Sequence, residues 1–218
     1  MKAVGRKPCL SMNIPYEYCA YRYLELWERA EKPLYRALSG MHSAVQIRDA
    51  LKYYKVARNF KGLKEDNIAE NISKKLLEID GCKGSYSDNV EKLAESFKVS
   101  CGQYNLSAAS KLLWLRNRSP YLIYDSRAVT ALNCLGNKLK NADYTSYCAA
   151  WLREYEKQRD EILLAARGLV DSPRKYTAAF ALTNDELIEI VHSKWFIERV
   201  FDIYLWDHPE NLSPDGVE

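Results

Sequence analysis

The sequence predicts an all-α protein, and three observations indicate this class. Apolar residues recur at spacings of three and four along most of the chain, Gly and Pro are few, and extended patterning is confined to one short piece. The chain has 218 residues, 47% of them hydrophobic, which is enough to bury the core of one domain. We therefore expect a single domain over residues 1–218.

Ten segments carry the helical periodicity, and we expect a helix in each. In chain order they are 16–30, 34–39, 43–59, 66–79, 87–97, 107–116, 126–135, 144–166, 184–192 and 194–206. Pro33 precedes the second segment, Gly40 and Gly81 follow the second and the fourth, and Ser87 or Asp88 is the expected N-cap of the fifth. Residues 121–124, which follow Ser119-Pro120, are expected to be extended.

Several classes of protein are excluded by what the sequence lacks. No stretch reaches 18 uncharged apolar residues, so no membrane span is expected, and the first residues show no secretory leader. The six Cys form no CxxC pair, the three His are not at metal-ligand spacing, and no Walker A or GxGxxG pattern is present. We expect a cytoplasmic protein with reduced thiols, no metal and no cofactor.

Charge is distributed unevenly along the chain. Residues 1–118 carry 21 Lys and Arg against 13 Asp and Glu, a balance of +8, whereas residues 119–218 carry 11 against 16, a balance of −5. The first part is therefore suited to face a polyanion such as DNA. The alternative is a solvated basic surface with no partner.

A basic stripe lies within the predicted helix 43–59. Arg48, Lys52 and Lys55 are spaced four and three apart, so they are expected on one helix face, with Tyr53 and Tyr54 among them. Cations interleaved with aromatic rings suit a nucleic-acid backbone. A solvated face whose tyrosines pack on the core is the alternative.

Lys111 and Asp125 are the candidate catalytic residues. Lys111 lies in the first turns of a helix that is otherwise apolar on both sides, and both the helix dipole and desolvation disfavour its ammonium form. A neutral lysine is a nucleophile that forms Schiff bases. Asp125 follows 14 residues later, after a Pro break and the extended piece, a length that lets it fold back toward Lys111. The alternatives are a surface lysine and an ordinary helix N-cap.

This stretch resembles the helix-hairpin-helix DNA glycosylases of the 8-oxoguanine class. The residues that carry the resemblance are Ser-Ala-Ala-Ser-Lys-Leu-Leu-Trp at 107–114 and Ile-Tyr-Asp-Ser-Arg-Ala at 123–128, and the match covers about residues 98–135. The sequences of these two segments are most similar to those of short bacterial proteins with the 8-oxoguanine-glycosylase fold. Such proteins occur in anti-phage defence operons, including cyclic-oligonucleotide signalling (CBASS) operons. No N-terminal β-rich domain is visible, which is similar to the compact archaeal subclass.

The resemblance implies a two-lobed helical fold with a cleft between the lobes, and a flipped-out purine such as 8-oxoguanine as substrate. It implies that Lys111 attacks the sugar and forms a Schiff base, that Asp125 assists, and that β-elimination nicks the strand. It places Leu115 against the base. Gln103 and Tyr104 are candidates to read or wedge beside the base, with turn packing as the alternative. Trp195, Phe196 and Trp206 are candidates for an aromatic wall, with a role in the core as the alternative. Gly102 is the remaining glycine of the hairpin that contacts a DNA phosphate, because the usual Gly-x-Gly is absent.

Three functions remain open at this point. The first is base excision on DNA, in repair or anti-phage defence. A monomer is the favoured oligomeric state. The second is a glycosylase fold that binds nucleic acid without catalysis, and the third is a scaffold protein of a defence operon. The Lys111–Asp125 pair separates the first from the other two, because only excision needs both side chains at one cleft.

Overall fold

The structure is a computed structural model, which describes residues 14–40, 43–60, 66–80, 84–139, 143–172 and 177–208. Within these ranges the chain is helical and contains no strand, as the sequence predicts. The α-helices are α1 (Tyr16–Leu26), α2 (Lys32–Leu38), α3 (Ala44–Tyr53), α4 (Asp66–Asp80), α5 (Tyr86–Cys101), α6 (Leu106–Asn117), α7 (Ser126–Cys134), α8 (Tyr144–Gly168), α9 (Asn184–His192) and α10 (Lys194–Trp206). None of the helices in these ranges is long and apolar enough to cross a lipid bilayer.

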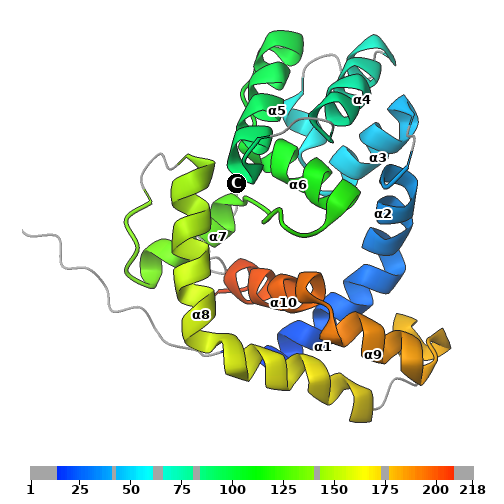
Figure 1. The fold of residues 1–218 in the computed structure, drawn as a ribbon, viewed down its shortest axis with the longest axis vertical. Helices are drawn as coiled ribbons and strands as arrows, with labels where there is room; N and C mark the ends of the chain where they lie inside the picture. Colours follow the sequence, from blue (N-terminus) through cyan, green and yellow to red (C-terminus); the bar gives the residue numbers. More distant parts are fainter. Residues whose placement is uncertain are drawn as a thin grey trace, which may run out of the picture.

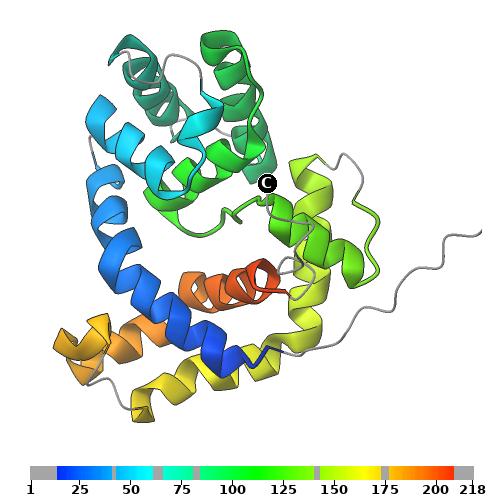
Figure 2. The ribbon, with the colours of Figure 1, turned by 180° about the vertical axis from the view of Figure 1, so that it is seen from behind.

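The helices form two groups, which Figure 1 shows one above the other. Helices α3, α4, α5 and α6 pack together in one group, and α1, α8, α9 and α10 pack together in the other. Helix α2 joins the groups along one side, and α7 lies on the opposite side against α8 and α10, as the view from behind also shows (Figure 2). Between the two groups, α5 contacts α8.

The first predicted helix does not end before Pro33. Residues Trp27–Glu31 form one turn of π-helix that connects α1 directly to α2, and the N–H of Lys32 donates to the carbonyl of Trp27, five residues back. Pro33, which has no N–H, falls in the first turn of α2, where this donor is not needed. The prediction of a break was wrong because a π-turn carries the chain into a proline without interrupting the helix.

The predicted helix 43–59 was wrong at its C-terminal end. Helix α3 stops at Tyr53, because Lys55 adopts a left-handed conformation with φ of 57°. The N–H of Val56 then donates to the carbonyl of Leu51 and that of Lys55 to Lys52, which together form a Schellman cap. Glycine usually occupies this position, so the sequence carries no stop signal here.

The fifth helix begins earlier than predicted, because Ser85 and not Ser87 or Asp88 is its N-cap. The hydroxyl of Ser85 accepts from the N–H of Asp88, whose carboxylate accepts from the N–H of Ser85. Asp88 is thus the third helical residue of a capping box.

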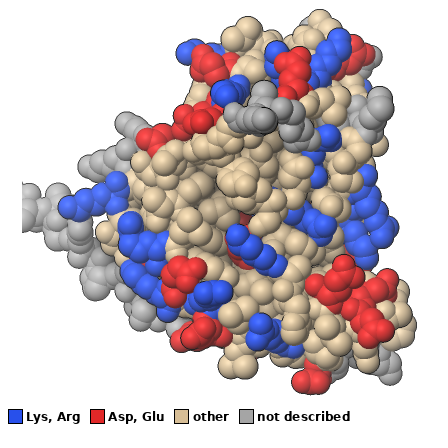
Figure 3. Space-filling model, viewed as in Figure 1, with Lys and Arg blue, Asp and Glu red and all other residues tan. Residues whose placement is uncertain are grey.

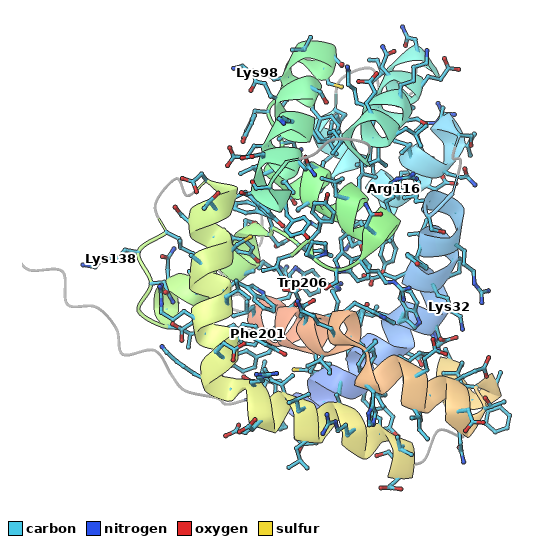
Figure 4. The ribbon with its side chains drawn as sticks, in the orientation of Figure 1. Lys32, Lys98, Arg116, Lys138, Phe201 and Trp206 are labelled. Atoms are coloured by element: carbon cyan, nitrogen blue, oxygen red, sulfur yellow. The ribbon has the colours of Figure 1, made fainter. Side chains whose placement is uncertain are left out.

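Helix α6 is buried on all sides. Every residue from Ala108 to Leu115 is buried, and Lys111 is only 5% exposed. The end of the helix is fixed by Arg116, whose guanidinium donates to the carbonyls of Leu38 and Gly40 (Figure 4). Because an isolated charge is costly in such a helix, Lys111 requires a partner.

The extended piece before α7 is held by side chains instead of by a neighbouring strand. The hydroxyl of Tyr144 donates to the carbonyl of Leu122 and accepts from its N–H, at 2.7 and 2.9 Å. The hydroxyl of Tyr147 donates to the carbonyl of Ile123 at 2.7 Å. The N–H of Tyr124 donates to the hydroxyl of Ser110 at 2.9 Å. These bonds satisfy buried peptide groups and fix the start of α7 against α6 and α8.

We expect Tyr147→Phe to lower the free energy of unfolding by about 1–3 kcal/mol, because the buried carbonyl of Ile123 loses its donor. Urea unfolding followed by circular dichroism measures the change. Tyr86→Phe removes the same hydroxyl from a side chain that is 57% exposed and is the matched control. Equal effects of the two variants would contradict this account of the extended piece.

Candidate functional site

The structure brings Lys111 and Asp125 together. The Nζ atom of Lys111 lies 2.7 Å from Oδ2 of Asp125 and 2.8 Å from the hydroxyl of Ser107, one turn earlier on α6. The side chain of Lys111 is 6% exposed and that of Asp125 is 20% exposed. Lys111 is therefore not a surface lysine, and its charge is satisfied by a carboxylate and a hydroxyl.

Asp125 performs two tasks at once. Its Oδ1 atom accepts from the N–H of Arg127 and caps α7, while its Oδ2 atom faces Lys111. The helix cap fixes the orientation of the carboxylate, and the side-chain bonds to residues 122–124 fix its position. The ordinary N-cap role and the pairing with Lys111 are therefore compatible.

Lys111 and Asp125 lie in the wall of a cavity of about 280 Å³ between the two groups of helices. Ligand sites commonly span about 300–1,000 Å³, so this cavity suits one ring system. The wall combines residues from both groups: Arg22, Leu26, Glu31, Tyr53, Tyr54, Lys55, Lys111, Ile123, Asp125, Ala128, Arg199, Asp202, Ile203 and Trp206.

Three buried charged groups lie beside the pair in the same wall. Arg199 donates to Glu31 at 2.8 Å and to Asp202 at 2.9 Å. Burial disfavours the charge of Arg199, but Glu31 and Asp202 outweigh this effect and hold its pKa well above the ordinary value. Burial also raises the pKa of Asp202, although Arg199 opposes the shift. We call these three residues the Arg199 cluster.

Tyrosines and a tryptophan donate further hydrogen bonds to the two carboxylates of the Arg199 cluster. Tyr23 and Tyr54 donate to Glu31 at 3.1 and 3.2 Å, and the indole of Trp151 donates to Asp202 at 2.8 Å. The ring of Tyr54 also lies 5.5 Å from Nζ of Lys111. Tyr54 therefore connects the cluster to the candidate nucleophile.

Lys55 lies apart from the stripe in which the sequence places it. Since α3 ends at Tyr53, the left-handed backbone at residue 55 carries this lysine into the cavity wall. Arg48 is half-buried on α3, and Lys52 is exposed and pairs with Asp49 at 3.8 Å. Lys55 lies beyond the end of α3 and so is not on a helix face with Arg48 and Lys52, neither of which lines the cavity.

Trp206, a candidate aromatic wall residue in the sequence, lines the cavity, whereas Glu31, Arg199 and Asp202 are cavity residues that sequence reasoning missed. Trp206 lies at the end of α10 nearest α7, with Arg127 at 4.5 Å and Arg22 at 5.6 Å from its ring (Figure 4). Arg22 also pairs with Asp207. A signal is present in the sequence, because Trp206 follows Asp202 by one helical turn, but only the fold shows that this face is not fully buried.

The other predicted base contacts lie elsewhere. Leu115 is completely buried in α6, and Gln103 and Tyr104 are exposed in the turn between α5 and α6. None of the three lines the cavity. Gly102 has φ of 71° and ends α5 in that same turn, so its position requires a left-handed residue.

Trp195 also lies outside the cavity lining. Its ring packs against Trp27 with centroids 4.3 Å apart, and the guanidinium of Arg118 lies 4.7 Å from it. Arg118 in turn stacks on Tyr35 at 4.0 Å. Trp195 thus contributes to an aromatic cluster around Arg118 at the end of α6.

The surface charges do not form one basic band on the face drawn in Figure 3. Basic side chains gather along the edge formed by α2, acidic ones gather near α9, and the centre of the face is largely uncharged. Among the described residues, no group of three or more His, Cys, Asp or Glu is arranged to hold a metal ion.

Comparisons of this chain with protein-family models, with curated proteins and with solved structures find no match. The geometry of the cavity and the chemistry of its side chains are therefore the basis for a functional proposal.

We expect Glu31→Gln to lower the free energy of unfolding by about 3 kcal/mol, because it removes one carboxylate from a buried ion cluster. Thermal and urea unfolding measure this loss. Glu156→Gln, which removes a 59% exposed carboxylate paired with Arg159, is the control and should change stability by less than about 1 kcal/mol. A loss below about 1 kcal/mol for Glu31→Gln would contradict the structural role of the cluster.

We expect Lys55→Gly to be more stable than Lys55→Ala by about 1 kcal/mol. Both variants remove the ammonium, but only glycine adopts a φ of 57° without steric cost. Urea unfolding of the two variants measures the difference. Equal stabilities would show that residue 55 is not left-handed in solution.

Proposed function

We propose that this protein is a DNA glycosylase with lyase activity that excises a damaged or modified purine, of the 8-oxoguanine kind, through a Schiff base on Lys111. The observation that carries the proposal is the Lys111–Asp125 pair at 2.7 Å in the wall of a cavity sized for one ring system. A lysine with an adjacent carboxylate and a bound sugar is what this chemistry requires.

The order of elements supports a helix-hairpin-helix glycosylase fold. In this proposal α5, the turn at 102–105 and α6 form the hairpin unit, and the two groups of helices form the two lobes. The turn lies between two buried helix ends, and Asn105 caps α6 by accepting from the N–H of Ala108. Gly102, Gln103 and Tyr104 are exposed there, where they are accessible to a DNA strand.

The proposed reaction uses both side chains. Asp125 accepts a proton from the Lys111 ammonium, and the amine then bonds to the anomeric carbon as the glycosidic bond breaks. The bonding electrons leave with the base, which takes up a proton. Opening of the sugar ring and loss of a second amine proton give the Schiff base, and loss of a C2′ proton then expels the 3′ phosphate.

The cavity also offers aromatic surface to an extruded base. Trp206 and Tyr53 lie in its wall, and the guanidinium groups of Arg22 and Arg127 lie 5.6 and 4.5 Å from the centroid of the Trp206 ring. Flat rings of this kind stack on any nucleobase. In this proposal Trp206 holds the purine while Lys111 and Asp125 act on its sugar. A role in anti-phage defence is part of the same proposal and rests on the sequence resemblance.

We expect Lys111→Gln to abolish strand nicking and Asp125→Asn to slow base excision roughly 10²–10⁴-fold. Duplex DNA with one 8-oxoguanine is the substrate, and gel analysis with and without alkali separates nicking from excision. Asn can still cap α7, but it leaves the Lys111 charge without a carboxylate, so a loss of stability is expected alongside the loss of activity. Lys75→Gln, which alters an exposed lysine on α4, is the control.

Thermal unfolding of each variant shows whether it is folded. Full activity of a folded Lys111→Gln variant would refute the proposal. Lesion-dependent binding without excision by the unaltered protein would favour the catalytically inactive nucleic-acid-binding protein, and no binding at low salt would favour the scaffold.

A further inference from the structure

Lys55 differs from the other cations of the cavity wall in having no carboxylate partner among the described residues. Lys111 pairs with Asp125, Arg22 with Asp207, and Arg199 with Glu31 and Asp202. The side chain of Lys55 is exposed. The cavity wall therefore carries one cation whose charge the described part of the chain does not balance.

The backbone at Lys55 gives a second and independent observation. Residue 55 is left-handed, with φ of 57°, at a helix end where glycine is the least strained residue. Lys55 lies in the same cavity wall as Lys111. Strained backbone of this kind is concentrated at ligand sites.

We propose that Lys55 binds one phosphate group of the nucleotide whose base occupies the cavity. This inference rests on the proposed function and deepens it, because it makes the ligand a nucleotide unit and not a base alone. An ammonium on a flexible stem suits a phosphate oxygen, and a flipped nucleotide brings a phosphate on each side of its sugar. The other two cations of the predicted stripe lie outside the cavity and do not share this contact.

The phosphate has two chemical sources. It is either an internal phosphodiester of a DNA strand or the terminal phosphate of a free mononucleotide. The charge and position of Lys55 fit both, so the test contains one arm for each source.

In the first arm, fluorescence anisotropy measures binding of a duplex that carries a tetrahydrofuran abasic analogue. Neutral methylphosphonates replace the flanking phosphates one at a time. At one position the neutral group should weaken binding by the unaltered protein roughly fivefold, the size of one ion pair at an accessible site. Lys55→Ala should weaken binding of the unmodified duplex to the same degree and should be insensitive to that methylphosphonate.

Two control variants separate charge from folding. Lys55→Gly relieves the backbone while removing the ammonium, so it should bind as weakly as Lys55→Ala. Lys52→Ala should remain sensitive to the methylphosphonate. The slope of log affinity against log salt concentration should fall by about one for Lys55→Ala.

If Lys55→Ala and the methylphosphonate act independently at every position, their fold-losses in affinity will multiply. That result would overturn the inference and leave the proposed function standing. Absence of any preference for the abasic duplex would overturn the proposed function. In the second arm, binding of deoxyguanosine monophosphate but not of deoxyguanosine, lost in Lys55→Ala, would support the phosphate contact while assigning it to a free nucleotide.

Discussion

The Arg199 cluster is the interaction on which the arrangement of the two helix groups depends. Arg199 on α10 meets Glu31, which is 168 residues away along the chain, and Glu31 in turn accepts from Tyr54 at the end of α3. A buried charge without a partner is strongly destabilising. In the folded protein, Arg199 and Glu31 must therefore stay in contact, and the helices that carry them are held at a fixed distance. The cluster therefore fixes the distance between α10 and the end of α3, and hence the width of the cavity.

The Lys111–Asp125 pair follows from a similar constraint within the other part of the cavity wall. Helix α6 is buried on every side, so its single lysine needs a carboxylate. The hydroxyls of Tyr144 and Tyr147 hold the segment that brings Asp125 to this lysine. The pair is buried enough to be fixed and exposed enough, through Asp125, to meet a ligand. In the proposed reaction, the lysine of this structural ion pair is also the nucleophile.

Much of the fold could be predicted from the sequence, because an amphipathic helix such as α9 carries its period and its ends in local residues. The end of α3 could not, since a lysine occupies the left-handed position where glycine would give the signal. For the site, the loop length between Lys111 and Asp125 indicated their approach. Other features of the site depend on long-range packing that no local pattern encodes. These are the ion pair between Glu31 and Arg199, the position of Lys55 in the cavity wall, and the absence of Leu115 and Trp195 from that wall.

The central claim is that the buried amine of Lys111 becomes covalently attached to a sugar in DNA. Borohydride reduction of the protein mixed with 8-oxoguanine duplex, followed by proteolysis and mass spectrometry, tests it most directly, because reduction makes a Schiff base permanent at the residue that formed it. The account predicts a sugar adduct on the peptide containing Lys111. An adduct on another lysine, such as Lys55, or no adduct on a duplex whose lesion base is nevertheless released, would contradict it.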